Sequence, residues 1–144
     1  DGTRLYLATT PPGPGEDRFI WLTTEAPAGQ RAGPWNKAGQ VVSTPGVFLG
    51  NEGDGDFSGW FAIGTGPNED AQIDAPAGRG EVVEGQIDLD ALGLQPGAQV
   101  WAAVLTFAGQ DGEPLTAQLP EGNRDLNIDP AEFFVLDLAG LRTP

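Results

Sequence analysis

Residues 98–107 read AQVWAAVLTF and form the longest strand pattern in the chain. β-branched and aromatic residues, which fit a pleated surface, are frequent in this run. Its apolar density is too high for a strand with one face in water, so we expect it near the centre of a sheet. This run therefore indicates a β protein with covered sheet faces.

Shorter runs of the same kind occupy much of the remaining sequence, and each ends at glycine, proline or acidic residues typical of turns. Residues 88–94, DLDALGL, instead predict one helical turn with Asp88 as its cap and Gly93 at its end. The expected strands besides 98–107 are 3–9, 18–24, 41–42, 47–49, 57–63, 81–87 and 133–138.

The turn residues and the strand spacing together predict the fold class. The 144 residues include 22 Gly and 13 Pro without a collagen-like period, which favours many tight turns. About eight short strands between such turns predict an all-β, two-sheet antiparallel β-sandwich or jelly roll. The length fits one domain spanning residues 1–144.

The charge of the chain limits its partners. Twenty-one acidic and seven basic residues give a net charge of −14. Phosphate backbones and anionic membrane surfaces both require a basic face, so we expect neither nucleic acid binding nor membrane insertion. Such self-repulsion destabilises a compact state unless counterions offset it, and divalent cations would do so.

The sequence lacks the side chains of most catalytic sites. It contains no His and no Cys, which excludes histidine-based triads, thiol nucleophiles and histidine-bound zinc. A glycoside hydrolase would need only two carboxylates facing each other across a cleft, and this alternative stays open. We otherwise expect a protein without enzymatic activity.

Two acidic loops predict calcium binding. Residues 52–56, EGDGD, alternate carboxylates with glycine, and residues 123–132, NRDLNIDPAE, carry oxygen side chains at alternate positions before a final Glu. Hard cations take six to eight such oxygens. The second loop resembles the start of an EF-hand or dockerin loop, but it lacks the usual glycine and its last Glu comes early. The predicted metal ligands are Glu52, Asp54, Asp56, Asn123, Asp125, Asn127, Asp129 and Glu132. The alternative is that both loops are ordinary solvated turns.

The four tryptophans divide into two groups. Trp21, Trp60 and Trp101 lie inside strand patterns and are expected in the core. Trp35 lies in a Gly/Pro-rich loop, where an exposed indole would contact a sugar or a partner surface. Alternatively, it plugs one end of the sandwich.

Four stretches carry a resemblance to a known family: RAGPWNKAGQ at 31–40, FLGNE at 48–52, DFSGWF at 56–61 and GNRDLNID at 122–129. They resemble an uncharacterised family of secreted bacterial β-sandwich domains from multidomain surface proteins. The resemblance implies an extracellular or cell-surface setting and a sandwich of the type that carbohydrate-binding modules use. It implies no activity.

Two roles follow as hypotheses. In the first, the chain is a calcium-binding structural subunit of an extracellular surface assembly or filament, and its partners are copies of itself or other surface proteins. In the second, it is a carbohydrate-binding module whose glycan partner stacks on Trp35.

Overall fold

The computed structural model describes residues 3–41, 45–66, 68–95, 97–122 and 127–138. It confirms the predicted all-β class: short strands dominate, and the described helices are three single turns, η1 (Pro34–Asn36), η2 (Asp90–Leu92) and η3 (Pro130–Glu132). The strands are β1 (Arg4–Thr9), β2 (Glu16–Thr23), β3 (Arg31–Ala32), β4 (Gln40–Val41), β5 (Gly46–Glu52), β6 (Ser58–Ala62), β7 (Ala71–Ile73), β8 (Ala77–Arg79), β9 (Val83–Asp88), β10 (Gln99–Ala108), β11 (Leu115–Leu119), β12 (Asn127–Ile128) and β13 (Phe134–Asp137).

The main layer is a seven-stranded sheet with the order β11-β10-β2-β5-β6-β7, in which β13 also pairs with β10. All its pairings are antiparallel, as expected. β11 and β13 divide the length of β10 between them, with β13 against residues 99–102 and β11 against residues 104–107. The strand predicted from AQVWAAVLTF is therefore an interior strand, although β2 and β5 lie closer to the centre.

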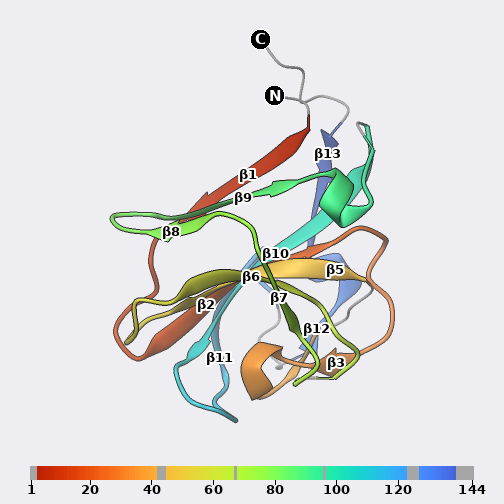
Figure 1. Ribbon diagram of the computed structural model, residues 1–144. Coiled ribbons are helices and arrows are strands. Elements are labelled where there is room, and N and C mark those ends of the chain that lie inside the picture. Colours follow the sequence, from red (N-terminus) through yellow and green to blue (C-terminus); the bar gives the residue numbers. More distant parts are fainter. Residues whose placement is uncertain (1–2, 42–44, 67, 96, 123–126, 139–144) are drawn as a thin grey trace.

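A second layer, the sheet β1-β9-β8, covers one face of the main sheet (Figure 1). Leu5, Val83 and Ile87 from this layer join Leu49 and Trp60 of the main sheet in one buried hydrophobic cluster. Burying these side chains against one another is the main stabilising contribution to the sandwich.

The opposite face of the main sheet is also covered. A second buried cluster contains Phe19, Trp21 and Phe48 from β2 and β5, and Val41 and Ile128 from β4 and β12. β4 and β12 belong to a small third sheet with the order β12-β4-β3, and the β12–β4 pair is parallel. Both faces of β2 are thus buried, which explains its uninterrupted apolar run.

Several sequence predictions need correction. Strands β7, β8 and β11 occupy stretches expected as turns, since short edge strands show no apolar alternation. Asp88 does not cap the helical turn: the N-cap of η2 is Leu89, and the Asp88 carboxylate instead accepts a hydrogen bond from Arg4 at 2.9 Å. Gly93 ends the turn as predicted, with a left-handed φ of 66°.

In the part of the chain that is described, no helix has the length and apolar character needed to cross a membrane.

Candidate functional site

The first acidic loop is organised around an internal cation, the Arg79 guanidinium. Arg79, at the end of β8, donates hydrogen bonds to the main-chain carbonyls of Glu52, Gly53 and Gly55, the bond to Gly53 spanning 3.3 Å. These carbonyl oxygens converge on one centre, as oxygens around a bound cation do. A side chain 23 to 27 residues away thus supplies positive charge to the predicted calcium loop, a feature that the local sequence pattern did not indicate.

The carboxylates of this loop point to separate partners. Asp54 Oδ1 accepts a hydrogen bond from the Gly15 amide at 2.7 Å, which ties the loop to the β1–β2 connection. Asp54 and Asp56 are exposed, whereas Glu52 is half-buried. Among the described residues, no group of three or more acidic side chains is gathered closely enough to hold a metal ion. Calcium at Glu52, Asp54 and Asp56 stays a prediction.

Half of the second acidic loop lies outside the described residues, namely the predicted ligands Asn123 and Asp125. Asn127 begins β12, and Asp129 and Glu132 form a capping box at η3. In that box the buried Glu132 accepts a hydrogen bond from the Asp129 amide at 2.8 Å. Helix capping therefore already accounts for two of the predicted ligands.

Trp35 lies over the aromatic part of the second cluster. Its ring meets Phe19 edge-to-face at a centroid distance of 4.8 Å and also contacts Phe48, Phe57 and Phe61. The side chain is half-buried, as the plug alternative for this residue expects. One part of it still lines a surface hollow, so contact with a partner stays a prediction.

A buried ion pair lies beside this aromatic group, and sequence reasoning missed it. Lys37 Nζ is 2.8 Å from Asp17 Oδ2, and the two side chains are only 2% and 8% exposed. Lys37 is the sole lysine of the chain, which is the one signal that singles it out in the sequence. A charge hidden from water with a single opposite charge is held by geometry, because desolvation makes any other arrangement costly.

A second buried pair fixes the loop between β6 and β7. Arg31 contacts both carboxylate oxygens of Asp70, at 2.5 and 3.0 Å, and lies 5.4 Å from the centre of the Trp21 ring. In the same loop, a hydrogen bond from the Thr65 hydroxyl lowers the pKa of Glu69. These contacts account for the charged residues of this loop without a ligand.

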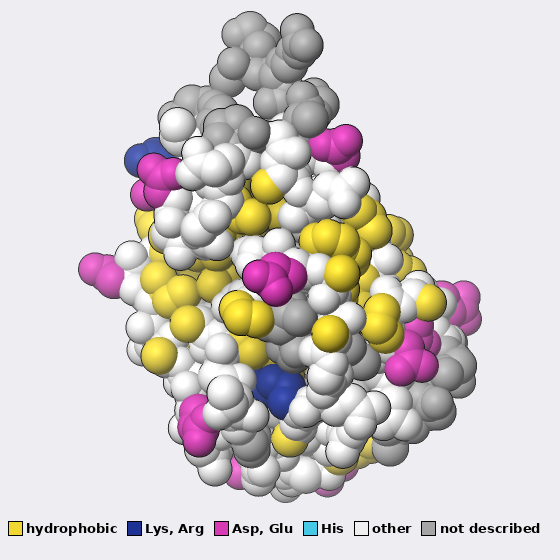
Figure 2. All heavy atoms as spheres, turned by 90° about the vertical axis from the view of Figure 1, so that its right-hand side faces the viewer, with side chains coloured by type: hydrophobic (Ala, Val, Ile, Leu, Met, Phe, Trp, Pro, Cys, Tyr) yellow, Lys and Arg dark blue, Asp and Glu magenta, His cyan; other side chains and the backbone are white. Residues whose placement is uncertain are grey.

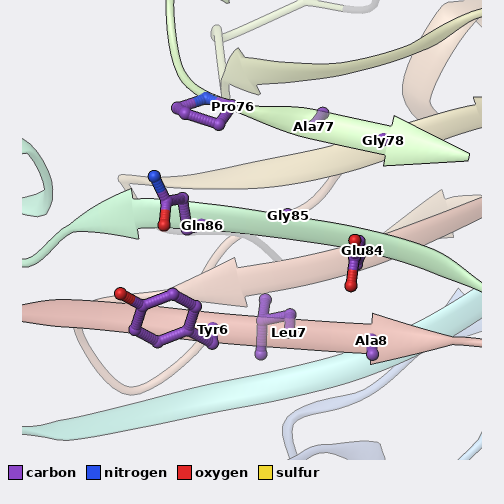
Figure 3. A pocket seen from close by; sticks show the side chains of 9 residues that line it. All are labelled: Tyr6, Leu7, Ala8, Pro76, Ala77, Gly78, Glu84, Gly85 and Gln86. Atoms are coloured by element: carbon purple, nitrogen blue, oxygen red, sulfur yellow. The ribbon is translucent and has the colours of Figure 1, made fainter.

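The largest hollow lies on the outer face of the small sheet. It measures about 550 Å³ and runs across β1, β9 and β8. Tyr6, Glu84 and Gln86 project from the outer surface of β1 and β9 toward the same side (Figure 3). Tyr6 is 59% exposed, so an aromatic ring, an amide and a carboxylate are available together to a ligand. At the far end of this face, the Asp88 carboxylate raises the pKa of Arg4 through their hydrogen bond.

No family model, curated protein or solved structure matches the chain. The family resemblance drawn from the four sequence stretches stays a prediction.

Proposed function

We propose that this protein is a non-catalytic structural subunit that assembles with copies of itself through the edges of its sheets. The extracellular setting is the one that the family resemblance implies, and calcium is the expected counterion. The distribution of exposed apolar side chains carries the proposal.

Four of the five large hydrophobic side chains that are exposed among the described residues lie in edge strands. They are Tyr6 in β1, Leu119 in β11, and Phe134 and Val135 in β13, with exposed fractions from 44% to 59%. Exposed apolar residues scattered at random would fall mostly in the loops of a protein this rich in turns. Their concentration on unpaired edges is typical of surfaces that pair with another strand.

Acidic residues are kept away from the same edges. Of the 21 acidic residues, Asp137 alone lies in a described edge strand, counting β1, β7, β8, β11 and β13. Soluble β proteins commonly place charges on edge strands to prevent pairing between molecules. Here that protection is sparse, although the chain has acidic residues in excess.

The surface shows the same division on a larger scale. Figure 2 shows hydrophobic side chains gathered across the middle of one face, with acidic side chains mostly around them. A second copy of the chain fits this surface if cations screen the acidic rim. Assembly through such edges therefore depends on calcium or on ionic strength, because two chains of charge −14 repel each other.

A charge placed on β13 tests the role of the edges. We expect Val135→Glu to lower the particle mass measured by light scattering, because it places a carboxylate on the apolar edge. The matched control is Gln95→Glu, which adds the same charge at an exposed loop position. The edge proposal fails if both variants assemble to the same extent as the unmodified protein, or if the unmodified protein does not assemble.

Carbohydrate binding is the second candidate, and the hollow beside Tyr6 favours it. An exposed ring next to amide and carboxylate groups can stack on a sugar and accept its hydroxyl hydrogen bonds. A glycan array followed by calorimetry tests this candidate. We expect Tyr6→Ala to abolish binding and Trp35→Phe to preserve it; binding that depends on Trp35 instead would favour the site predicted from sequence.

A further inference from the structure

The buried pair of Lys37 and Asp17 has a geometry suited to bond formation as well as to ion pairing. Lys37 Nζ lies 2.8 Å from Asp17 Oδ2 and donates a second hydrogen bond to the Gln110 carbonyl at 2.9 Å. Atoms held at such separations in a fixed orientation react as if present at very high local concentration. Neither side chain has room to turn toward water, since Lys37 is 3% and Asp17 5% exposed as whole residues.

The surroundings hold each reacting group from a different direction. Asp17 begins next to the first residue of β2, and its second carboxylate oxygen, Oδ1, faces the Gly53 amide at 3.3 Å. Lys37 directly follows η1, in which Trp35 and Asn36 have positive φ angles of 50° and 58°. Two consecutive non-glycine residues in the left-handed region are strained, and this backbone turn directs Lys37 inward.

The adjoining hollow has aromatic walls and two further carboxylates. Trp35, Phe57 and Phe61 line it together with Glu52 and Asp111, and its volume is about 320–340 Å³ or less of open space beside the pair. Apolar walls reduce the solvation that normally favours separate charges over a neutral pair. Water formed in a reaction has a route out through this hollow.

We propose that Lys37 and Asp17 condense to form an intramolecular amide bond. The proton first passes from the ammonium group to Oδ2 along the 2.8 Å hydrogen bond, which leaves a neutral amine and a neutral acid. Nζ then attacks Cγ, the negative charge that develops on Oδ1 faces the Gly53 amide, and the Nζ–Cγ bond forms. The Cγ–Oδ2 bond breaks, and Oδ2 leaves as water with the proton it gained and one from the amine.

The step balances without any other reactant. An ammonium and a carboxylate give one amide and one water, and nothing is oxidised or reduced. Glu52 and Asp111 are the carboxylates in the hollow that can pass the second proton through water. The product joins β2 covalently to the segment that covers it, so it resists unfolding whether or not the chain assembles. The inference is thus independent of the proposed function.

Intact-mass spectrometry of the purified, denatured protein tests the proposal. The expected mass is lower than the sequence mass by one water molecule. Trypsin should fail to cut after Lys37, and residues 5–18 should remain joined to residues 32–79 as one branched product. An intact mass equal to the sequence mass, with normal cleavage after Lys37, would overturn the proposal.

Matched variants separate this bond from other losses of water. Asp–Gly sequences, such as Asp54-Gly55 and Asp111-Gly112, also lose water when they form a cyclic imide. Lys37→Arg keeps the charge but should restore the full sequence mass, whereas an imide would persist in that variant. Asp17→Ala should restore it in the same way, and the peptide map of the unmodified protein locates the bond even if a variant fails to fold.

Discussion

Gly50 illustrates how one residue positions the aromatic cover of the main sheet. A Cβ at position 50 would lie 2.7 Å from the Trp35 ring, closer than real side chains approach. The ring cannot easily move away, because Phe19, Phe48, Phe57 and Phe61 surround it. Glycine in the middle of β5 is therefore required for packing.

We predict that Gly50→Ala lowers the free energy of unfolding by about 1–3 kcal/mol, the usual cost of overpacking a filled core. Urea unfolding followed by tryptophan fluorescence measures this change. Gly80→Ala is the control, because nothing lies within 4 Å of a Cβ at position 80. An equal effect at both glycines would show that Trp35 does not pack as described.

The residue scale also shows where sequence reasoning stops. The inward-facing Trp21 and Trp60 could be predicted from strand patterns, and both are fully buried. Trp101, in contrast, is only partly buried, because β13 covers its strand incompletely. The Lys37–Asp17 contact joins positions that have no shared motif, so only the folded chain reveals it.

At the scale of elements, the loop after β5 depends on a side chain from β8. Arg79 bonds to three carbonyls of residues 52–55, and these carbonyls would lack a partner without it. Hydrogen bonds to a charged group contribute more than neutral ones. The loop is therefore an extension of the small sheet rather than an independent motif.

We predict that Arg79→Gln destabilises the protein by about 1.5–3 kcal/mol, the range for losing hydrogen bonds to a charged group. It should also speed hydrogen exchange of the amides of residues 52–56. Arg4→Gln is the matched control, since Arg4 forms an exposed pair with Asp88 and should change stability much less. If calcium holds this loop, adding calcium should slow its exchange in the Arg79 variant; unchanged exchange in the variant without calcium would contradict the role given to Arg79.

The elements found from sequence share a physical property. β2, β5, β6 and β10 are interior strands, and interior burial requires apolar runs that a sequence displays. β7, β8 and β11 lie at edges, where polar and small residues are tolerated, so their sequences look like turns. β3, β4 and β12 have two residues each, too few for any period to appear.

On the scale of the whole molecule, two layers and the segments packed on their outer side leave several strands unpaired on one side. β1 begins and β13 ends at the same end of the molecule, at the top of Figure 1. Both strands expose apolar side chains there or along their length. The sandwich itself follows from sequence, but the edges that neighbours can reach depend on strand order, which the sequence does not encode locally.

The most direct measurement of the central claim is the particle mass of the unmodified protein in solution. Light scattering over a range of concentrations, first with calcium and then with a chelator, provides it. We predict particles heavier than one chain that grow with concentration and with calcium and shrink when the chelator is added. A particle with the mass of a single chain at every concentration, indifferent to calcium, would contradict the proposal that this protein is an assembly subunit.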